Sequence, residues 1–126
     1  MINICICGGG NLGHVIGGYL AAKPDINVSI LTRHPERWGI QLEITLPNGS
    51  STKGDLDIVT NAPSKVIPNT DIAFICLPGM YIRKEIEEIK PYLSPKTVVG
   101  TVVSSTGFFF QAHELIPNQP TFGFQR

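Results

Sequence analysis

The stretch Gly8-Gly9-Gly10-Asn11-Leu12-Gly13 decides the fold, because the segments on both sides of it support the same interpretation. An apolar run at residues 2–7 precedes the glycines, and a helical pattern follows them. Glycines allow a sharp turn and a close backbone approach, while the start of a helix presents free amide protons to an anion. Gly8, Gly10 and Gly13 occupy the three fixed positions of G-x-G-x-x-G, so this order of strand, turn and helix predicts a dinucleotide site.

Length and charge limit the class of protein. A chain of 126 residues is predicted to form one domain that buries roughly two-thirds of the surface of the unfolded chain. Ten basic and ten acidic residues give a formal net charge of zero, so no global field favours a nucleic acid or an anionic membrane as partner. No apolar run approaches the ~20 residues of a membrane span, and the N-terminus lacks a signal-peptide pattern. We therefore expect a cytoplasmic protein.

Three cysteines lie in apolar segments that are predicted to be strands: Cys5, Cys7 and Cys76. Cys5 and Cys7 share one face of a strand, but no second cluster of cysteine or histidine completes a metal site. We therefore predict buried free thiols and no bound metal.

The rest of the chain alternates strand and helix patterns. The first helix ends near Ala22, before Pro24, with Gly17 and Gly18 placed for tight packing on the sheet. Residues 26–31 are predicted to complete a βαβ unit. Residues 41–59 alternate polar and apolar on both sides of a turn at 47–50, which predicts a hairpin-like excursion with one wet face. The remaining predicted elements are strands at 71–77, 97–103 and 121–124 and helices at 80–93 and 108–115.

These elements predict an α/β fold: a doubly wound, mostly parallel Rossmann sheet in a single domain, with a hairpin-like insertion after the second strand. The ligand is expected beyond the carboxyl ends of the strands, where the strand order reverses. Three strand ends supply this rim, at Cys7/Gly8, Leu31/Thr32 and Leu77/Pro78.

The end of the second strand bears on the choice of nucleotide. In an NAD site an acidic side chain about 20 residues after the glycines binds the ribose hydroxyls. Here Thr32 and Arg33 hold that position, and no carboxylate follows until Glu36. A guanidinium binds a 2'-phosphate bidentately, and Arg37 reaches the same phosphate or stacks on adenine if the segment turns helically. NADP is therefore preferred to NAD, although a reading of both arginines as solvated surface charges stays open.

The histidines have weaker assignments. His14 begins the helix after the glycines, where it either approaches the pyrophosphate or faces a neighbouring strand. His34, apart from possible adenine stacking, and His113 are expected to be solvent residues.

Three pieces of sequence carry a resemblance to a known family: Cys5 to Asn11 with His14, Glu36-Arg37-Trp38, and Gly107-Phe108 with Phe110-Gln111. With them the chain resembles the N-terminal cofactor-binding domain of the octopine/nopaline (opine) dehydrogenases. Members of that family reduce the imine formed from an amino acid and a 2-oxo acid, using NADH or NADPH, so the resemblance implies a small-molecule substrate and hydride transfer.

The resemblance also implies roles for individual residues. The pyrophosphate would be held by Gly8, Gly10, Asn11, Leu12 and Gly13, the adenosine end by Thr32, Arg33 and Arg37, and the nicotinamide side by Leu77, Pro78 and Gly79. Ser104, Ser105 and Thr106 would face the gap between nicotinamide and substrate. Family members carry the catalytic histidine and its acidic partner in a second, helical domain, and nothing in residues 1–126 matches that pair. We therefore expect no catalytic residue here, and a chain that binds NADP(H) without turning over an imine.

Two other classes of function remain open. One is a sensing or partner-binding module that binds NAD(P) without catalysis, and the other is the cofactor domain of a ketopantoate-reductase-like or hydroxyacid-dehydrogenase-like enzyme. Five phenylalanines crowd the C-terminal part of the chain, more than one small sheet edge can hide: Phe108, Phe109, Phe110, Phe122 and Phe124. They predict a docking surface and a possible homodimer.

Overall fold

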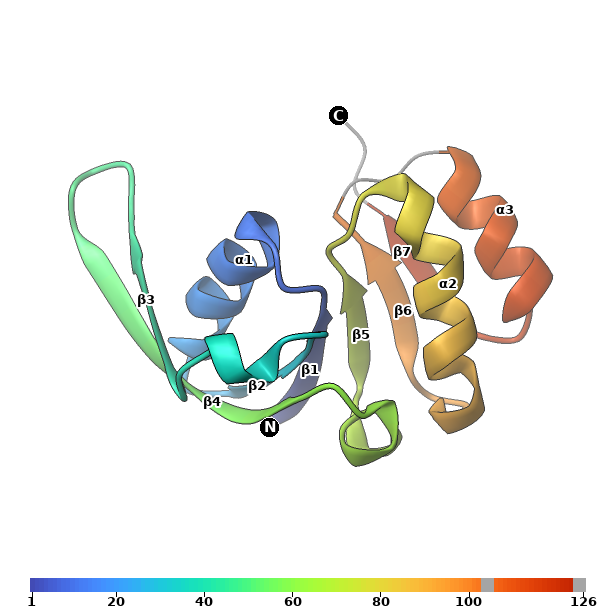
Figure 1. Ribbon diagram of the computed structural model, residues 1–126, viewed down its shortest axis with the longest axis horizontal. Coiled ribbons are helices and arrows are strands. Elements are labelled where there is room, and N and C mark those ends of the chain that lie inside the picture. Colours follow the sequence, from blue (N-terminus) through green and yellow to red (C-terminus); the bar gives the residue numbers. More distant parts are fainter. Residues whose placement is uncertain (103–105, 124–126) are drawn as a thin grey trace.

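One seven-stranded sheet organises the chain in its computed structural model, which describes residues 1–102 and 106–123 (Figure 1). The strands are β1 (Ile2–Cys7), β2 (Ile26–Leu31), β3 (Gln41–Thr45), β4 (Ser51–Thr60), β5 (Ile72–Ile75), β6 (Val98–Thr101) and β7 (Thr121–Gly123). Their order is β3-β4-β2-β1-β5-β6-β7, and β3 with β4 is the antiparallel pair in an otherwise parallel arrangement. The predicted doubly wound, mostly parallel sheet is therefore confirmed.

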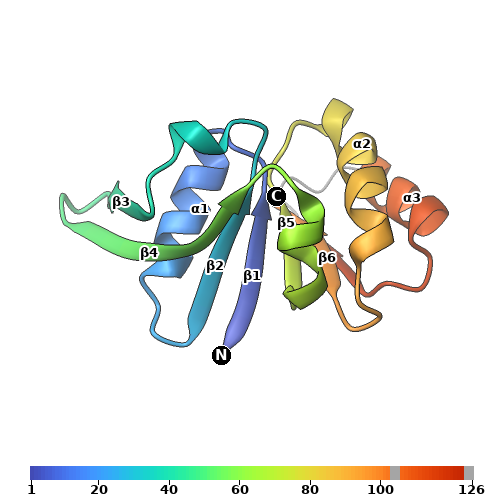
Figure 2. The same ribbon diagram turned by 60° about the horizontal axis from the view of Figure 1, so that its bottom comes forward.

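Within the described residues, three α-helices flank the strands: α1 (Asn11–Ala21), α2 (Gly79–Ile89) and α3 (Thr106–Leu115). Figure 2 shows α1 apart from the α2 and α3 pair, with β2, β1 and β5 between them. Four 3-10 turns join these elements, at Pro35–Arg37, Pro63–Lys65, Ile67–Asn69 and Lys90–Tyr92. The helix expected at 80–93 ends at Ile89 because Pro91 has no amide proton for a further α-helical hydrogen bond, so the chain continues as a 3-10 turn.

The predicted hairpin is present, and its second strand has an additional role. β3 pairs with the first half of β4, from Thr45 opposite Ser51 to Gln41 opposite Asp55. The second half of β4 then runs parallel to β2, with Leu31 opposite Thr60. β4 is therefore both the return strand of the hairpin and a full member of the main sheet.

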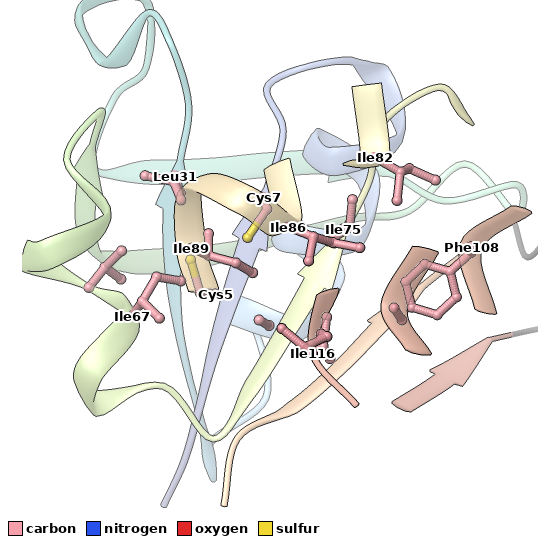
Figure 3. Packing of buried hydrophobic residues seen from close by; sticks show 14 residues of the cluster. Cys5, Cys7, Leu31, Ile67, Ile75, Ile82, Ile86, Ile89, Phe108 and Ile116 are labelled. Atoms are coloured by element: carbon pink, nitrogen blue, oxygen red, sulfur yellow. The ribbon is translucent and has the colours of Figure 1, made fainter. Parts of the chain in front are cut away.

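The sheet separates two apolar cores, as the alternation of side chains along a strand requires. Ile4 and Ile6 of β1 belong to the core under α1, while Cys5 and Cys7 belong to the core under α2 and α3. Figure 3 shows the two cysteines among the isoleucines of α2. All three cysteines are free and buried, which confirms the expected burial.

Glycines form the inner face of α1, which packs on the sheet. Gly13, Gly17 and Gly18 are the buried residues of this helix. A Cβ on Gly18 would lie 2.6 Å from Cγ2 of Ile44 in β3, so only a bare backbone allows this approach. The tight packing expected at Gly18 is confirmed, whereas a Cβ on Gly17 would make an ordinary contact, 3.4 Å from Cδ1 of Ile30.

Candidate functional site

A cavity of about 660 Å³ opens at the carboxyl ends of β1, β2 and β5. β1 lies between β2 and β5, so this is the point at which the strand order reverses. All three strand ends named from the sequence contribute lining residues: Gly8, Leu31, Thr32, Leu77 and Pro78. The predicted place of the ligand site therefore coincides with the cavity.

Two glycines of the turn are required by the fold itself. Gly8 has φ +130°, and a Cβ there would lie 2.6 Å from the carbonyl oxygen of Cys76. Its amide donates to the carbonyl oxygen of Leu31 at 2.9 Å, which ties the turn to β2. A Cβ on Gly13 would lie 2.7 Å from the carbonyl oxygen of Gly8. Side chains at these two positions would push the helix away from the strand.

Gly10 is different, because nothing in the fold requires glycine there. Its φ of −83° and ψ of −174° are open to any residue, and an added Cβ would meet no atom within 4 Å. Gly10 is the N-cap of α1, and the first turn contains no acidic residue. The first amide protons of a helix have no partner within the helix, so a bare, uncrowded backbone faces open space where the pyrophosphate of a dinucleotide would approach.

Not every residue of the glycine motif lines the cavity. Gly8 and Gly9 do, whereas Gly10, Asn11, Leu12 and Gly13 form the beginning of α1 next to them. The helix start therefore adjoins the cavity at one end. The holding of a pyrophosphate by these residues stays a prediction.

The end of β2 supplies the cationic side of the cavity. Thr32 is buried, and its amide donates to the carbonyl oxygen of Thr60 at 2.9 Å. Arg33 and Arg37 both line the cavity, because the 3-10 turn Pro35–Arg37 reverses the chain between them. The helical turn that the sequence reasoning required for Arg37 is thus present in its shorter 3-10 form.

His14 stacks on Trp38 at the edge of the cavity. Their ring centroids lie 3.8 Å apart with 17° between the planes. Nδ1–H of His14 donates to the carbonyl oxygen of Gly10 at 3.0 Å, which fixes the ring over the glycine turn. His14 therefore faces the cavity and not a neighbouring strand, and Trp38, the single tryptophan of the chain, lines the same space.

One face of α2 forms the opposite wall, and the sequence reasoning missed it. Tyr81, Lys84, Glu85 and Glu88 line the cavity. Tyr81 is 44% exposed, and the guanidinium carbon of Arg33 lies 6.0 Å from its ring centroid. A signal for this wall was present in the sequence: the four residues have the spacing i, i+3, i+4, i+7, which places them on one stripe of a helix that begins directly after the end of β5.

Glu85 is the charged group of this wall with the most altered ionisation. Burial raises its pKa to about 7, and the charge of Glu88 acts in the same direction. The charges of Arg33 and Lys84 lower the pKa and so oppose this rise. A carboxyl that is only partly ionised near neutral pH therefore faces the cationic end of β2.

The residues predicted to lie on the nicotinamide side come from the end of β5, the start of α2 and the segment before α3. Leu77 and Pro78 line the cavity, while Gly79 is the exposed first residue of α2. Ser104 and Ser105 lie outside the described residues, and Thr106 is the first residue of α3. Asn61, which no sequence signal singled out, completes the lining near the end of β4.

The cysteines are buried in the fold, while the two other histidines lie at the rim of the cavity and on α3. Burial raises the pKa of Cys76 to about 12, and the pKa of Cys7 is raised by its interaction with the Cys5 thiol and by burial. Nδ1 of His34, at the rim of the cavity, lies 3.2 Å from Oε1 of Glu36. His113 is exposed on α3. Within residues 1–102 and 106–123, no group of three or more His, Cys, Asp or Glu residues is arranged to hold a metal ion.

The same described residues contain no helix with the length and apolar character needed to cross a bilayer.

Comparison with known proteins adds independent observations. The sequence profile described as Ketopantoate reductase PanE/ApbA matches residues 4–123. The opine dehydrogenase of Haliotis discus hannai is 30% identical over 94% of this chain and 33% of its own length. The octopine dehydrogenase of Pecten maximus is 26% identical over 91% of this chain and 32% of its own length. The chain thus spans about a third of the length of these relatives, and the resemblance to opine dehydrogenases is confirmed.

A solved structure supports the fold. That of an octopine dehydrogenase with NADH and pyruvate superposes with a TM-score of 0.87, at 21% identity, over 98% of this chain and 35% of that one. An identity this low shows the fold alone. The sheet and its flanking helices therefore have the same Rossmann-like arrangement as that structure.

Proposed function

We propose that this chain, which belongs to the ketopantoate reductase PanE/ApbA family, is the dinucleotide-binding part of an oxidoreductase of the opine dehydrogenase type. The observation that carries the proposal is the uncrowded backbone of Gly10, at the start of α1, beside a cavity lined by two arginines. A bare helix start accommodates a pyrophosphate, and the arginines suit a further phosphate. The names of the relatives, opine dehydrogenase and octopine dehydrogenase, support the reaction class.

NADP(H) is the cofactor that we propose, with NAD(H) as the less favoured alternative. Gly8, Gly10, Asn11, Leu12 and Gly13 would hold the pyrophosphate through backbone amides. Thr32, Arg33 and Arg37 would hold the adenosine end, and Leu77, Pro78 and Gly79 would lie on the nicotinamide side, with Ser104 toward the substrate. The support for NADP is the lack of an acidic side chain at the end of β2, where Thr32 and Arg33 stand.

The bound cofactor would supply the hydride, and this chain would position it. The proposed substrate is the imine of an amino acid and a 2-oxo acid. We infer that the proton donor lies outside residues 1–126, in a helical catalytic domain like that of the family. His14 is committed to Gly10 and Trp38, and His113 is exposed on α3, away from the lining of the cavity.

Titration of the purified 126-residue protein with NADPH, NADH and ADP-ribose tests the proposal. Trp38 is the only tryptophan and lines the cavity, so its fluorescence reports binding alongside calorimetry. We expect NADPH to bind at least tenfold more tightly than NADH, which corresponds to about 1.4 kcal/mol. Binding of none of the three compounds would refute the proposed function.

Substitution of the cationic wall makes the test specific. Arg33→Gln is expected to weaken NADPH binding about 10- to 100-fold and NADH binding by less than threefold, since only NADPH carries the 2'-phosphate. Arg83→Gln is the matched control, because Arg83 also carries a positive charge but pairs with Glu87 and Glu114 away from the cavity. Equal losses for NADPH and NADH in the Arg33 variant would assign that residue a general role and remove the argument for NADP.

The family match favours a second candidate, the cofactor domain of a 2-oxo acid reductase of the ketopantoate reductase type. The 2-dehydropantoate 2-reductase of Porphyromonas gingivalis W83 has the same fold, with a TM-score of 0.78 at 21% identity over 97% of this chain and 45% of that one. Both candidates use the same dinucleotide site, so binding does not separate them. Reduction of free ketopantoate, but not of a 2-oxo acid with an added amino acid, by a longer protein that includes this chain would favour the second.

A further inference from the structure

The wall that α2 presents to the cavity carries charges that the end of β2 does not. Successive turns of α2 place Ile82, Ile86 and Ile89 in the core and Tyr81, Lys84, Glu85 and Glu88 along the cavity. The two carboxyls therefore line the same cavity as Arg33 and Arg37. A nucleotide held by these arginines would share the cavity with both carboxyls.

Glu85 is the most enclosed charged residue of this lining. It is half-buried, whereas Arg33, His34, Arg37, Lys84 and Glu88 are exposed. Within the described part of the chain, its carboxyl has no hydrogen-bond or salt-bridge partner. Desolvation disfavours the charged form of a half-buried carboxyl that has no partner, and a ligand or a nearby charge strongly changes this cost.

The groups facing Glu85 come from three elements. Arg33 follows β2, Lys84 and Glu88 share α2 with it, and the thiol of Cys7 at the end of β1 lies close enough for the Glu85 charge to raise the pKa of that thiol. The other ionisable groups that line the cavity are His14, His34, Arg37 and Tyr81. The charge of Arg33 acts on Glu85, so the protonation state of Glu85 affects the binding of a ligand by Arg33.

We propose that Glu85 is a specificity-determining residue of the adenosine site: its charged carboxylate opposes a 2'-phosphate held by Arg33 and leaves a 2'-hydroxyl unopposed. The preference for NADPH over NADH is then set jointly by the arginines of one wall and by the charge of Glu85 on the other. The inference rests on the proposed function, since it concerns the adenosine end of the same site. Ionisation of Glu85 also makes the preference for NADPH depend on pH, with the opposite sign to the dependence that ionisation of the phosphate produces.

The two titrations act in opposite directions. A phosphate monoester gains its second charge near pH 6, so rising pH strengthens its attraction to Arg33 and raises the preference for NADPH. Ionisation of Glu85, whose pKa is raised to about 7, lowers that preference over an overlapping range. Protonation of His14 and His34 at low pH affects the wild-type protein and a Glu85 variant alike. A comparison of the two proteins at each pH therefore isolates Glu85.

The test measures the ratio of the dissociation constants for NADH and NADPH at pH 6 and pH 8.5, by calorimetry on the 126-residue protein. We expect Glu85→Gln to raise the preference for NADPH about 5- to 10-fold at pH 8.5 and less than twofold at pH 6, with NADH affinity nearly unchanged. Glu85→Asp, which keeps the charge, is expected to stay close to the wild-type ratio. Glu87→Gln is the matched control, since Glu87 lies on the same helix, pairs with Arg83 and does not line the cavity.

The outcomes separate this inference from the proposed function. If wild-type protein binds neither NADPH nor NADH, the proposed function fails and the inference fails with it. If both bind but the ratio is the same in wild type and Glu85→Gln at pH 8.5, or shifts equally in Glu87→Gln, the inference alone is overturned. If Glu85→Gln does not fold, the ratios of the dissociation constants for NADH and NADPH in the wild-type and Glu85→Asp proteins provide the test. A wild-type preference for NADPH that rises steeply from pH 6 to pH 8.5 would contradict an opposing carboxylate.

Discussion

Replacement of Gly10 by alanine separates a glycine needed by a ligand from a glycine needed by the fold. An added Cβ at Gly10 meets no protein atom within 4 Å, and the φ of −83° suits alanine. At Gly8 the same addition brings a Cβ to 2.6 Å from the carbonyl oxygen of Cys76, at a φ of +130°. The two substitutions add the same atom to the same turn, but only one of them collides with the protein.

The expected effects follow from these surroundings. At Gly10, alanine is a poorer N-cap than glycine by roughly 0.5–1 kcal/mol, while the unfolded chain loses roughly 0.4–1 kcal/mol of conformational freedom. The two terms nearly cancel, so the free energy of unfolding changes by less than about 0.5 kcal/mol. Binding of NADPH is expected to weaken roughly 10- to 100-fold, since the Cβ keeps the pyrophosphate from at least one amide in a charge-assisted hydrogen bond worth about 1.5–3 kcal/mol.

Gly8→Ala has the opposite profile. Forcing alanine into a backbone region reserved for glycine costs roughly 1–3 kcal/mol, and the contact with Cys76 adds to this cost. With about 4 °C lost per kcal/mol in a domain of this size, the melting temperature is expected to fall by roughly 8–15 °C. Gly49→Ala supplies a control, because Gly49 has φ +87° in the turn between β3 and β4 and does not line the cavity. It should lower stability without affecting binding.

Thermal unfolding and calorimetric titration with NADPH, carried out on the three variants and the wild type, measure both quantities. The Gly10 variant is expected to lose affinity at wild-type stability, and the Gly49 variant is expected to keep its affinity at reduced stability. A Gly10 variant that binds NADPH as tightly as the wild type would refute the role of the open backbone. Loss of stability in that variant equal to the loss in Gly8→Ala would show that the fold, and not a ligand, needs glycine at this position.

Three further predictions concern the rest of the molecule. Burial raises the pKa of Glu85 from an ordinary 4.5 to about 7, so the folded state retains a proton that the unfolded chain releases, and stability falls as pH rises from about 4.5 to 7. In urea unfolding, Glu85→Gln should be roughly 1–3 kcal/mol more stable than wild type at pH 8 and equal to it below pH 4.5. Cys5, Cys7 and Cys76 are buried and free, so Ellman's reagent should label them slowly in native protein and completely in concentrated guanidinium, and rapid native labelling would contradict this burial. Phe110 is 70% exposed on α3, so if the expected homodimer forms there, light scattering should show a dimer that Phe110→Glu dissociates, whereas a monomeric wild type at micromolar concentrations would rule the dimer out.

Much of the fold was predictable because its determinants are local. The glycine turn, the apolar run of β1 and the polar-to-apolar alternation of β3 are features of short segments, and the structure confirms each. On α3, Phe108 is buried whereas Phe109 and Phe110 are exposed, so the periodicity of the helix divides three of the phenylalanines between its packed side and its outer side. Phe124 lies outside the described residues.

The site was predictable at its strand ends and less so on its helices. Thr32, Arg33, Leu77 and Pro78 line the cavity because parallel strands end on the same side of a sheet, which the order of elements already implies. Trp38 carried part of a family resemblance but no assigned place in the site. Its position depends on the path of the chain after the 3-10 turn and on its stacking with His14, a contact between residues 24 positions apart.

The sequence by itself determined a glycine turn between a buried strand and a helix, and an arginine where NAD sites carry an acid. Local backbone sterics and hydrophobic periodicity are sufficient to specify such features. Only the tertiary structure decided that Glu85 and Tyr81 of α2 face the same cavity as Arg33. That outcome depends on how far α2 is rotated about its axis, and this rotation is set by the packing of Ile82, Ile86 and Ile89 against residues distant in the chain.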